Sequence, residues 1–322
     1  MEPTASSQTK RQHPLNQLPI SPGRMAYGCW RLAGTWDASA IDEEKSKQAE
    51  TAVMTAVESG FTLFDHADIY CDGEAERLFG ETLKKQPGLR DKILIASKCG
   101  IRFAGQPDSL SPYRYDFSKD HIIQSCEGSL KRLGTDHLDI LMLHRPDFLG
   151  NPNEVAEAVD HLQSKGMIRL FGASNFSPSQ IEMYHQAGAN IAVHQIEISL
   201  VSHQAISDGR LDQCQQHQIT PMAWSPLSRG ILGDGLRPDF EHQTSDSASG
   251  LLEKVDEIAD ELGTNRSTIT LAWLLRHPAE IMPVIGSTHP ERIRQAMQAC
   301  NIKLSRDQWY RLTEAALGSR LP

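Results

Sequence analysis

The sequence predicts a single (β/α)8 barrel, and three observations lead to that fold class. The 322 residues are in the range of one such barrel. Short continuous apolar runs alternate about eight times with amphipathic segments, as buried parallel strands and their crossover helices do. A doubly wound sheet is the alternative, but it would need a G-x-G-x-x-G motif after the first strand. Only isolated glycines, Gly23, Gly28 and Gly34, occur there, which favours the barrel.

The predicted strands are apolar runs that stop at polar or small residues. In chain order they are residues 25–29, 62–64, 93–97, 138–143, 168–173, 191–196, 220–223 and 281–285. Amphipathic patterns predict helices over residues 44–58, 74–85, 120–133, 155–165, 179–186, 251–262 and 290–299, and several of these patterns end at a glycine. Two longer loops, 102–118 and 227–249, follow the third and seventh strands, and we expect them on the catalytic face.

Composition bounds the domain organisation and the function. Residues 1–18 are polar and lack the apolar stretch of a signal peptide, so we expect a disordered tail followed by one domain over 19–322. No apolar run is long enough to span a membrane. The net charge of −9 argues against nucleic-acid binding. The six cysteines include no C-x-x-C pair, which is typical of a reducing compartment and predicts a cytoplasmic protein.

Polar side chains collect at the points where the predicted strands end. In a barrel these points surround one mouth, the usual place of the active site. The strand-end residues are Asp65, Lys98, His144, Asn175, Gln195, Trp224 and Gly286. They are far apart in the sequence, so the barrel predicts a cluster that no local motif would reveal.

Tyr70 lies five residues beyond Asp65, in a loop that can fold over this mouth. A free phenol has a pKa near ~10, too high for easy proton exchange at neutral pH. The ammonium of Lys98 would lower that pKa, and Asp65 would hold Lys98 charged and in place. His144 would hydrogen-bond the same hydroxyl or the substrate oxygen. These residues together predict proton donation to a carbonyl group that receives a hydride.

Other interpretations exist for each residue taken alone. An Asp at the end of a strand is commonly a helix cap. A His before Arg-Pro is commonly structural, and a Tyr in a loop commonly serves packing. A metal-dependent hydrolase would use Asp65, His66, Asp68 and His144 as ligands. That alternative leaves Lys98, Asn175, Gln195 and Trp224 without a role, so we predict no metal site.

At these residues the sequence resembles the aldo-keto reductase superfamily, and its bacterial oxidoreductase-type members in particular. The resemblance runs from about Pro19 to Leu317. Its motifs are G-C-W-R-L at 28–32, F-D-H-A-D-I-Y at 64–70, S-K-C-G at 97–100, L-D-I-L-M-L-H-R-P-D at 138–147, G-A-S-N-F-S at 172–177, H-Q-I-E at 194–197, A-W-S-P-L-S-R-G at 223–230 and P-V-I-G-S at 283–287. Each motif is weak alone, but their order and spacing are specific.

The resemblance implies a barrel enzyme that reduces an aldehyde or ketone with a nicotinamide cofactor. It implies that Tyr70 is the general acid, in a tetrad with Asp65, Lys98 and His144. Ser174, Asn175 and Gln195 match the positions that bind the carboxamide, and Trp224 matches the ring that stacks on the nicotinamide. The remaining implied cofactor residues are Gly28, Cys29 and Trp30 on the first strand, Ser225, Pro226, Leu227, Arg229 and Gly230 over the pyrophosphate, and Gly286, Ser287, Thr288 and Arg292 near the adenosine.

The sequence departs from the family pattern at two places. The family usually has Thr after the catalytic Asp, whereas this chain has His66; the histidine either titrates beside the tetrad or only packs. Many members also have a basic residue where this chain has Thr288 or His289, so Arg292 or Arg294 would have to contact a 2′-phosphate. We therefore expect NADP(H), with NAD(H) as the alternative.

The resemblance leaves the partners of the chain partly open. We expect a small-molecule carbonyl substrate, and neither a nucleic acid nor a membrane as partner. Channel β subunits resemble the same family and regulate a partner, so a non-enzymatic role is the second alternative. The sequence does not determine the oligomeric state.

Overall fold

Eight parallel strands close into a barrel in the computed structural model, which describes residues 13–233 and 246–321. The strands follow one another around the barrel in the order β1-β10-β9-β8-β7-β6-β3-β2. Their bounds are β1 Ala26–Gly28, β2 Leu63–Asp65, β3 Leu94–Cys99, β6 Leu138–Leu143, β7 Ile168–Ser174, β8 Ile191–Glu197, β9 Thr220–Trp224 and β10 Met282–Ile285. The predicted (β/α)8 barrel is confirmed.

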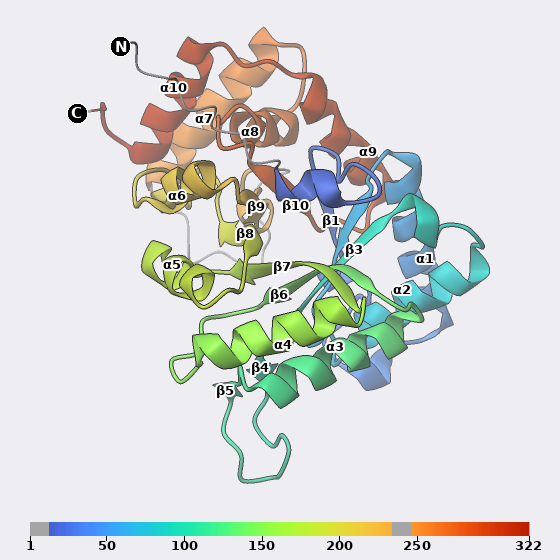
Figure 1. Ribbon diagram of the computed structural model, residues 1–322. Helices are drawn as coiled ribbons and strands as arrows, with labels where there is room; N and C mark the ends of the chain where they lie inside the picture. Colours follow the sequence, from blue (N-terminus) through green and yellow to red (C-terminus); the bar gives the residue numbers. More distant parts are fainter. Residues whose placement is uncertain (1–12, 234–245, 322) are drawn as a thin grey trace, which may run out of the picture.

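Helices surround these strands (Figure 1). Their bounds are α1 Glu43–Glu58, α2 Glu74–Lys85, α3 Lys119–Leu133, α4 Pro152–Ser164, α5 Pro178–Gln186, α6 Arg210–His217, α7 Asp246–Glu261, α8 Arg266–Leu275, α9 Pro290–Gln298 and α10 Arg306–Leu317. The sequence pattern missed α6, α8 and α10. Helix α8 is buried at every position from Thr268 to Leu275, so it has no polar face and no helical periodicity to detect.

Two apolar cores hold the barrel together. Side chains that point into the barrel, among them Leu63, Ile140 and Met222, form the inner core. The larger core lies between the strands and the helices. Each strand is thus covered on both faces, which explains why the strands read as continuous apolar runs rather than as alternating patterns.

The chain segment before β1 closes the N-terminal end of the barrel. Residues Pro14–Gln17 form a 3-10 helix, which begins where the His13 ring accepts a hydrogen bond from the backbone N–H of Leu15. Leu15 and Leu18 are buried and belong to the inner core. The expectation of a disordered tail was therefore wrong for residues 13–18, because two leucines give this polar-looking segment enough apolar surface to dock. Residues 1–12 lie outside the described part of the chain.

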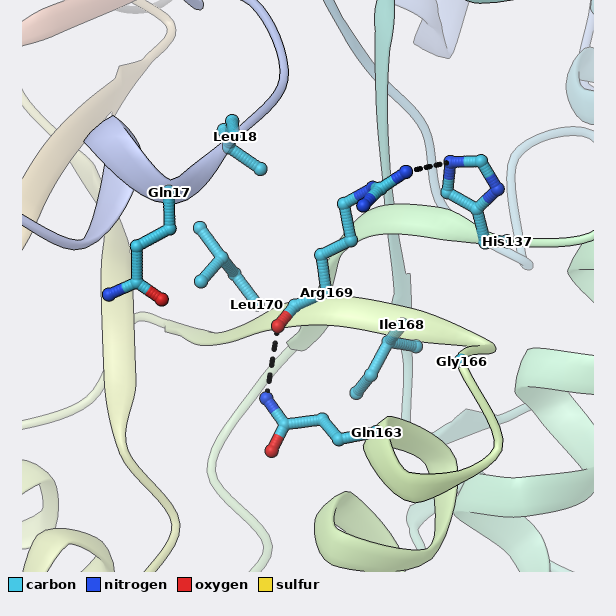
Figure 2. Close-up of a pocket in the computed structure, with 8 residues that line it drawn as sticks. All are labelled: Gln17, Leu18, His137, Gln163, Gly166, Ile168, Arg169 and Leu170. Carbon is cyan, nitrogen blue, oxygen red and sulfur yellow. Dashed lines mark hydrogen bonds between the residues drawn. The ribbon is translucent and has the colours of Figure 1, made fainter.

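The N-terminal end of the barrel also carries a shallow pocket of about 400 Å³ (Figure 2). Its lining residues are Gln17, Leu18, His137, Gln163, Gly166, Ile168, Arg169 and Leu170. The polar groups here interact with one another. Arg169 Nη2 lies 3.2 Å from His137 Nε2, and Arg169 Nε donates to Asp139 Oδ1 over 3.1 Å. This end of the barrel is therefore a structural ion-pair cluster, and the predicted site residues lie at the opposite end.

The first predicted loop follows β3, and the described part of the second, residues 227–233, follows β9; residues 246–249, which the prediction placed in that loop, belong to α7. The first contains a small antiparallel hairpin, β4 Ile101–Arg102 with β5 Arg114–Tyr115. Of the second, residues 234–245 lie outside the described part of the chain. Within the described ranges, no helix is long and apolar enough to cross a membrane.

Candidate active site

A cavity of about 840 Å³ opens at the C-terminal ends of the barrel strands. It is lined by most of the residues that the sequence pointed to: Gly28, Trp30, Asp65, Tyr70, His144, Ser174, Asn175, Gln195, Trp224, Ser225, Pro226, Leu227, Arg229, Gly230, Gly286, Ser287 and Arg292. Cys29, Lys98 and Thr288 do not line it. Parallel strands in register produce this convergence, since Gly28 pairs with Asp65 across β1 and β2, and Ser174 with Gln195 across β7 and β8.

Lys98 lies directly beneath the cavity and is paired with Asp65. The Lys98 Nζ atom donates to Asp65 Oδ1 over 2.7 Å and to the His66 carbonyl oxygen over 2.6 Å. Both side chains are almost fully enclosed. Burial, the largest single effect, would lower the pKa of Lys98, but Asp65 and Tyr70 together outweigh it and the net shift is upward. Lys98 is therefore a fixed cation at the floor of the site.

Tyr70 stands between this cation and His144. The Lys98 Nζ atom lies 5.0 Å from the centroid of the Tyr70 ring, and the Tyr70 and His144 rings meet edge to face with centroids 6.0 Å apart. Burial raises the pKa of the Tyr70 phenol, and the Lys98 charge opposes that rise without cancelling it. The sequence argument had expected the pKa to fall, because it counted the neighbouring ammonium but not the loss of water around the hydroxyl.

His144 is neutral in this site. Burial, followed by the charges of Lys98 and Arg145, lowers its pKa well below the ordinary value for histidine. Its backbone N–H donates to the Cys99 carbonyl oxygen over 2.9 Å, which fixes the residue at the end of β6. Among the described residues, the buried Nδ1 atom has no hydrogen-bond partner. A neutral imidazole can donate one hydrogen bond to an oxygen atom in the cavity, but it is a poor acid.

Asn175 connects three strand ends on one side of the cavity. Its backbone N–H donates to the Gln195 carbonyl oxygen over 2.9 Å, and its side-chain Nδ2 donates to Ser174 Oγ over 2.7 Å. Trp224 Nε1 donates to Asn175 Oδ1 over 2.9 Å, which holds the indole ring in the cavity wall. The buried Nε2 group of Gln195 has no hydrogen-bond partner in the part of the chain that the structure describes. An orphaned buried donor beside a fixed aromatic ring fits an amide-bearing aromatic ligand.

The segment after Trp224 has an unusual backbone. Ser225, Ser228 and Arg229 have φ angles of 49°, 45° and 58°. These left-handed conformations cost residues other than glycine on the order of 1 kcal/mol each, and such strain collects at ligand sites. The turn is closed by the Ser228 N–H, which donates to the Ser225 carbonyl oxygen over 2.8 Å. Arg229, at the tip of this turn, lines the cavity.

Trp30 covers the other side of the cavity. Its Nε1 atom would lie only 2.5 Å from a Cβ atom on residue 286, so the indole can occupy this place only because Gly286 has no side chain. The Trp36 ring follows it, with ring centroids 6.2 Å apart. These two indoles form an aromatic wall near the mouth, of which the sequence motif indicated only Trp30.

His66, the unusual residue of the F-D-H-A-D-I-Y motif, faces away from the cavity. Its ring is fully buried and packs edge-on against Phe79, with centroids 4.6 Å apart. Burial and the charge of Lys98 lower its pKa to about 3. Of the two alternatives for His66, the structure favours packing, and the same orientation removes this residue from the hypothetical metal ligands.

A buried acidic pair lies behind the tetrad. Glu76 accepts from Ser97 Oγ over 2.5 Å and from Arg132 Nε over 2.7 Å. Asp68 Oδ1 is buried and has no hydrogen-bond partner among residues 13–233 and 246–321. Burial, helped by the charge of Glu76, raises the pKa of Asp68 to about 8. Within the described ranges, no three His, Cys, Asp or Glu side chains are grouped to hold a metal ion.

The sequence analysis did not identify several residues that line the cavity. Arg31, Trp36 and Arg145 line the mouth, and Ser267, Leu271 and Gln295 line the far end. Arg145 directly follows His144, so its position next to a strand end was a usable signal. Ser267 and Leu271 belong to α8, which the sequence pattern did not reveal.

Comparisons with known proteins agree with this geometry. The model of the Aldo/keto reductase family matches residues 24–317. The chain is 39% identical to the oxidoreductase YdhF of Escherichia coli, over 93% of this chain and 95% of that protein. It is 37% identical to a 6-dehydroglucose reductase of Agrobacterium fabrum, over 92% and 95%. Among solved structures, the thermostable aldo-keto reductase Tm1743 superposes with a TM-score of 0.77 at 25% identity, over 94% of this chain and 98% of that one.

Proposed function

Because the chain belongs to the aldo/keto reductase family and is an oxidoreductase, we propose that it reduces an aldehyde or ketone to an alcohol with NADP(H). In this proposal Tyr70 protonates the carbonyl oxygen. One observation carries it: a tyrosine on the cavity wall lies beside a lysine whose charge is fixed by a buried aspartate.

Each residue of the tetrad has a different role in the proposed reaction. When bound, the nicotinamide cofactor supplies a hydride to the carbonyl carbon. Tyr70 supplies the proton, and the positive charge of Lys98 stabilises the phenolate that remains. Asp65 keeps Lys98 in place, so this stabilisation needs no rearrangement during the reaction. His144, being neutral, donates a hydrogen bond that orients the carbonyl oxygen toward Tyr70.

The cavity wall fits a nicotinamide cofactor. The Trp224 ring, held by Asn175, offers a flat surface for the nicotinamide ring. Ser174, Asn175 and the unpartnered Gln195 Nε2 supply polar groups for the carboxamide. Arg229 and the strained turn at Ser225–Gly230 would bind the pyrophosphate, since cations and backbone N–H groups favour phosphate.

Arg292 supports NADP(H) over NAD(H). It lines the cavity at the start of α9, whereas Thr288 and Arg294 do not line it. We expect Arg292→Gln to raise the KM for NADPH about 10-fold, the effect of losing one charge-assisted contact to phosphate. The KM for NADH should change little. An equal change for both cofactors would remove Arg292 from the 2′-phosphate.

A turnover assay tests the proposed function. NADPH oxidation is followed with the purified protein and a panel of aldehydes and ketones, and 6-dehydroglucose, the compound in a relative's name, belongs in the panel. We expect cofactor oxidation that depends on the carbonyl compound. Tight NADPH binding without oxidation across the panel would contradict the proposal and favour a regulatory role instead.

A further inference from the structure

Arg145 places a positive charge beside the predicted carbonyl site. It directly follows His144 at the end of β6 and lines the cavity. Its guanidinium carbon lies 5.4 Å from the centroid of the Trp224 ring, in a cation–π contact. This contact holds the side chain over the indole, but an aromatic face does not accept the hydrogen bonds of the guanidinium N–H groups.

Arg145 has no anionic partner at close range. Within residues 13–233 and 246–321, no hydrogen bond or ion pair joins it to another side chain. Glu197, at the end of β8, feels its charge only at longer range. By contrast, Arg90 and Arg169 bind Asp139, and Arg132 binds Glu76. A half-buried guanidinium without such a partner is available to an anionic ligand.

The cavity has more cationic than acidic side chains among the described residues of its lining. Its lining includes the cations Arg31, Arg145, Arg229 and Arg292, and Asp65 is its one acidic member among the described residues. The charge of Asp65 is already matched by Lys98. This positive cavity lies in a chain whose net charge is −9, so its sign is local and not a general property of the surface.

Arg145 comes from a different strand end than the arginines proposed to bind the cofactor phosphates, and its guanidinium reaches across to Trp224 on β9. Arg229 belongs to the turn after β9, and Arg292 to the start of α9. Arg145 instead adjoins His144, whose ring faces Tyr70 edge to face. An anionic group that reaches Arg145 would therefore belong to the molecule whose carbonyl oxygen lies between Tyr70 and His144.

We infer that the substrate is a carbonyl compound that also carries a carboxylate, and that Arg145 binds this carboxylate. The inference rests on the proposed carbonyl reduction and adds the substrate class to it. The planar guanidinium donates two parallel hydrogen bonds to a carboxylate, which orients the molecule as well as attracting it. Arg145 would thus determine specificity, whereas Tyr70 performs the proton transfer.

Matched substrates test this inference. 4-Carboxybenzaldehyde and methyl 4-formylbenzoate have the same ring and aldehyde but differ in charge, and kcat/KM is measured for both with saturating NADPH. We expect the wild-type protein to prefer the acid. Arg145→Gln should lower kcat/KM for the acid about 10- to 100-fold, mainly through KM, and for the ester less than about 3-fold. Arg145→Lys should recover part of the preference.

A matched control is Arg306→Gln, since Arg306 also stacks on an aromatic ring, 5.1 Å from the Tyr310 centroid, but does not line the cavity. This variant should keep the wild-type preference. Equal losses for acid and ester in Arg145→Gln, or no preference for the acid in the wild-type protein, would overturn the inference while the ester's turnover leaves carbonyl reduction standing. Turnover of neither compound, nor of any in the wider panel, would overturn both.

Discussion

At the scale of single residues, Tyr70 shows why a list of neighbours is not enough to assign chemistry. Its phenol has an ammonium nearby, yet its pKa is raised because burial outweighs the charge of Lys98. A protonated phenol is the form that a reductase needs, since the hydroxyl must hold its proton until the carbonyl oxygen develops negative charge. In the proposed mechanism, Lys98 then acts mainly on the phenolate that forms.

His66 gives a prediction about acid stability. Its pKa is about 3 in the folded chain and near ~6.5 in the unfolded one, so below pH 6.5 the unfolded chain binds a proton that the folded chain does not. Stability should therefore fall as the pH falls toward 3, by about 2 kcal/mol at pH 5 from this group alone. His66→Leu should remove that loss, as measured by urea unfolding at pH 5 and 7.5.

The control for His66 is the partly exposed His161, replaced in the same way. We expect His161→Leu to keep the acid dependence of the wild-type protein. Because His66 is neutral and faces Phe79, His66→Leu should also leave the pH dependence of kcat near neutrality unchanged. A shifted kcat profile would mean that His66 does titrate beside the tetrad.

Asp68 should have the opposite effect on stability: it should make the protein less stable as the pH rises. Its pKa is about 8 in the folded chain, well above the value of ~3.9 for an unfolded chain. Between pH 4 and 8 the unfolded chain releases a proton that the folded chain keeps, so this group lowers stability by about 1.4 kcal/mol for each unit of rising pH. Asp68→Asn should therefore gain stability over the wild-type protein as the pH rises through this window.

Unfolding at several pH values measures this gain, with the exposed Asp160→Asn as the matched control. The control should differ from the wild-type protein by a constant amount at every pH. A constant difference for Asp68→Asn as well would mean that its carboxyl group is ionised in the folded protein.

At the scale of elements, β9 and the turn after it combine a fixed ring with a strained backbone. Trp224 is anchored by its hydrogen bond to Asn175, and the turn that follows has three non-glycine residues with positive φ. Strain of this kind persists only where the surrounding structure holds it, and it leaves backbone N–H groups aimed at a ligand. We therefore propose that the strand end and the turn act together to bind the cofactor.

Trp224→Ala tests this element. Loss of the stacking surface should raise the Kd for NADPH about 10-fold or more, since an aromatic contact of this kind contributes on the order of 1–3 kcal/mol. Equilibrium binding is measured by the change in NADPH fluorescence. Trp224→Phe, which keeps a ring, should lie much closer to the wild-type protein, and an unchanged Kd in the alanine variant would remove Trp224 from the cofactor site.

At the scale of the whole molecule, the two ends of the barrel differ: the N-terminal end is packed with apolar side chains, and the cavity lies at the C-terminal end. Leu15 and Leu18 close the N-terminal end, opposite the cavity. Leu15→Ala should cost about 2–4 kcal/mol of unfolding free energy, because it leaves a void in a packed core. The kcat per folded molecule should stay the same. Leu110→Ala, at a side chain 92% exposed, is the control and should change neither quantity.

If Leu15→Ala left the unfolding free energy unchanged, the N-terminal segment would be dispensable for the barrel. A lower kcat at full folding would instead mean that the two ends are coupled. Urea unfolding together with active-site titration distinguishes these results.

Sequence pattern predicted those features that depend on burial along a single element. The apolar runs placed all eight strands, and most of the residues at the ends of these runs line the cavity, although Lys98 does not. The sequence pattern did not predict features that depend on several elements. Helix α8 has no polar face, and Trp30 reaches its place only because of Gly286, far along the chain. The direction of the pKa shift at Tyr70 also depends on the whole surrounding shell rather than on one neighbour.

The central claim is that Tyr70 donates the proton to the substrate oxygen, and Tyr70→Phe tests it most directly. The variant keeps the ring and loses only the hydroxyl. We predict that kcat for carbonyl reduction falls by at least ~10³-fold while the Kd for NADPH stays within about 2-fold, because the hydroxyl acts in the transition state and not in cofactor binding. A variant that reduces the carbonyl at a rate close to that of the wild-type protein would contradict the account.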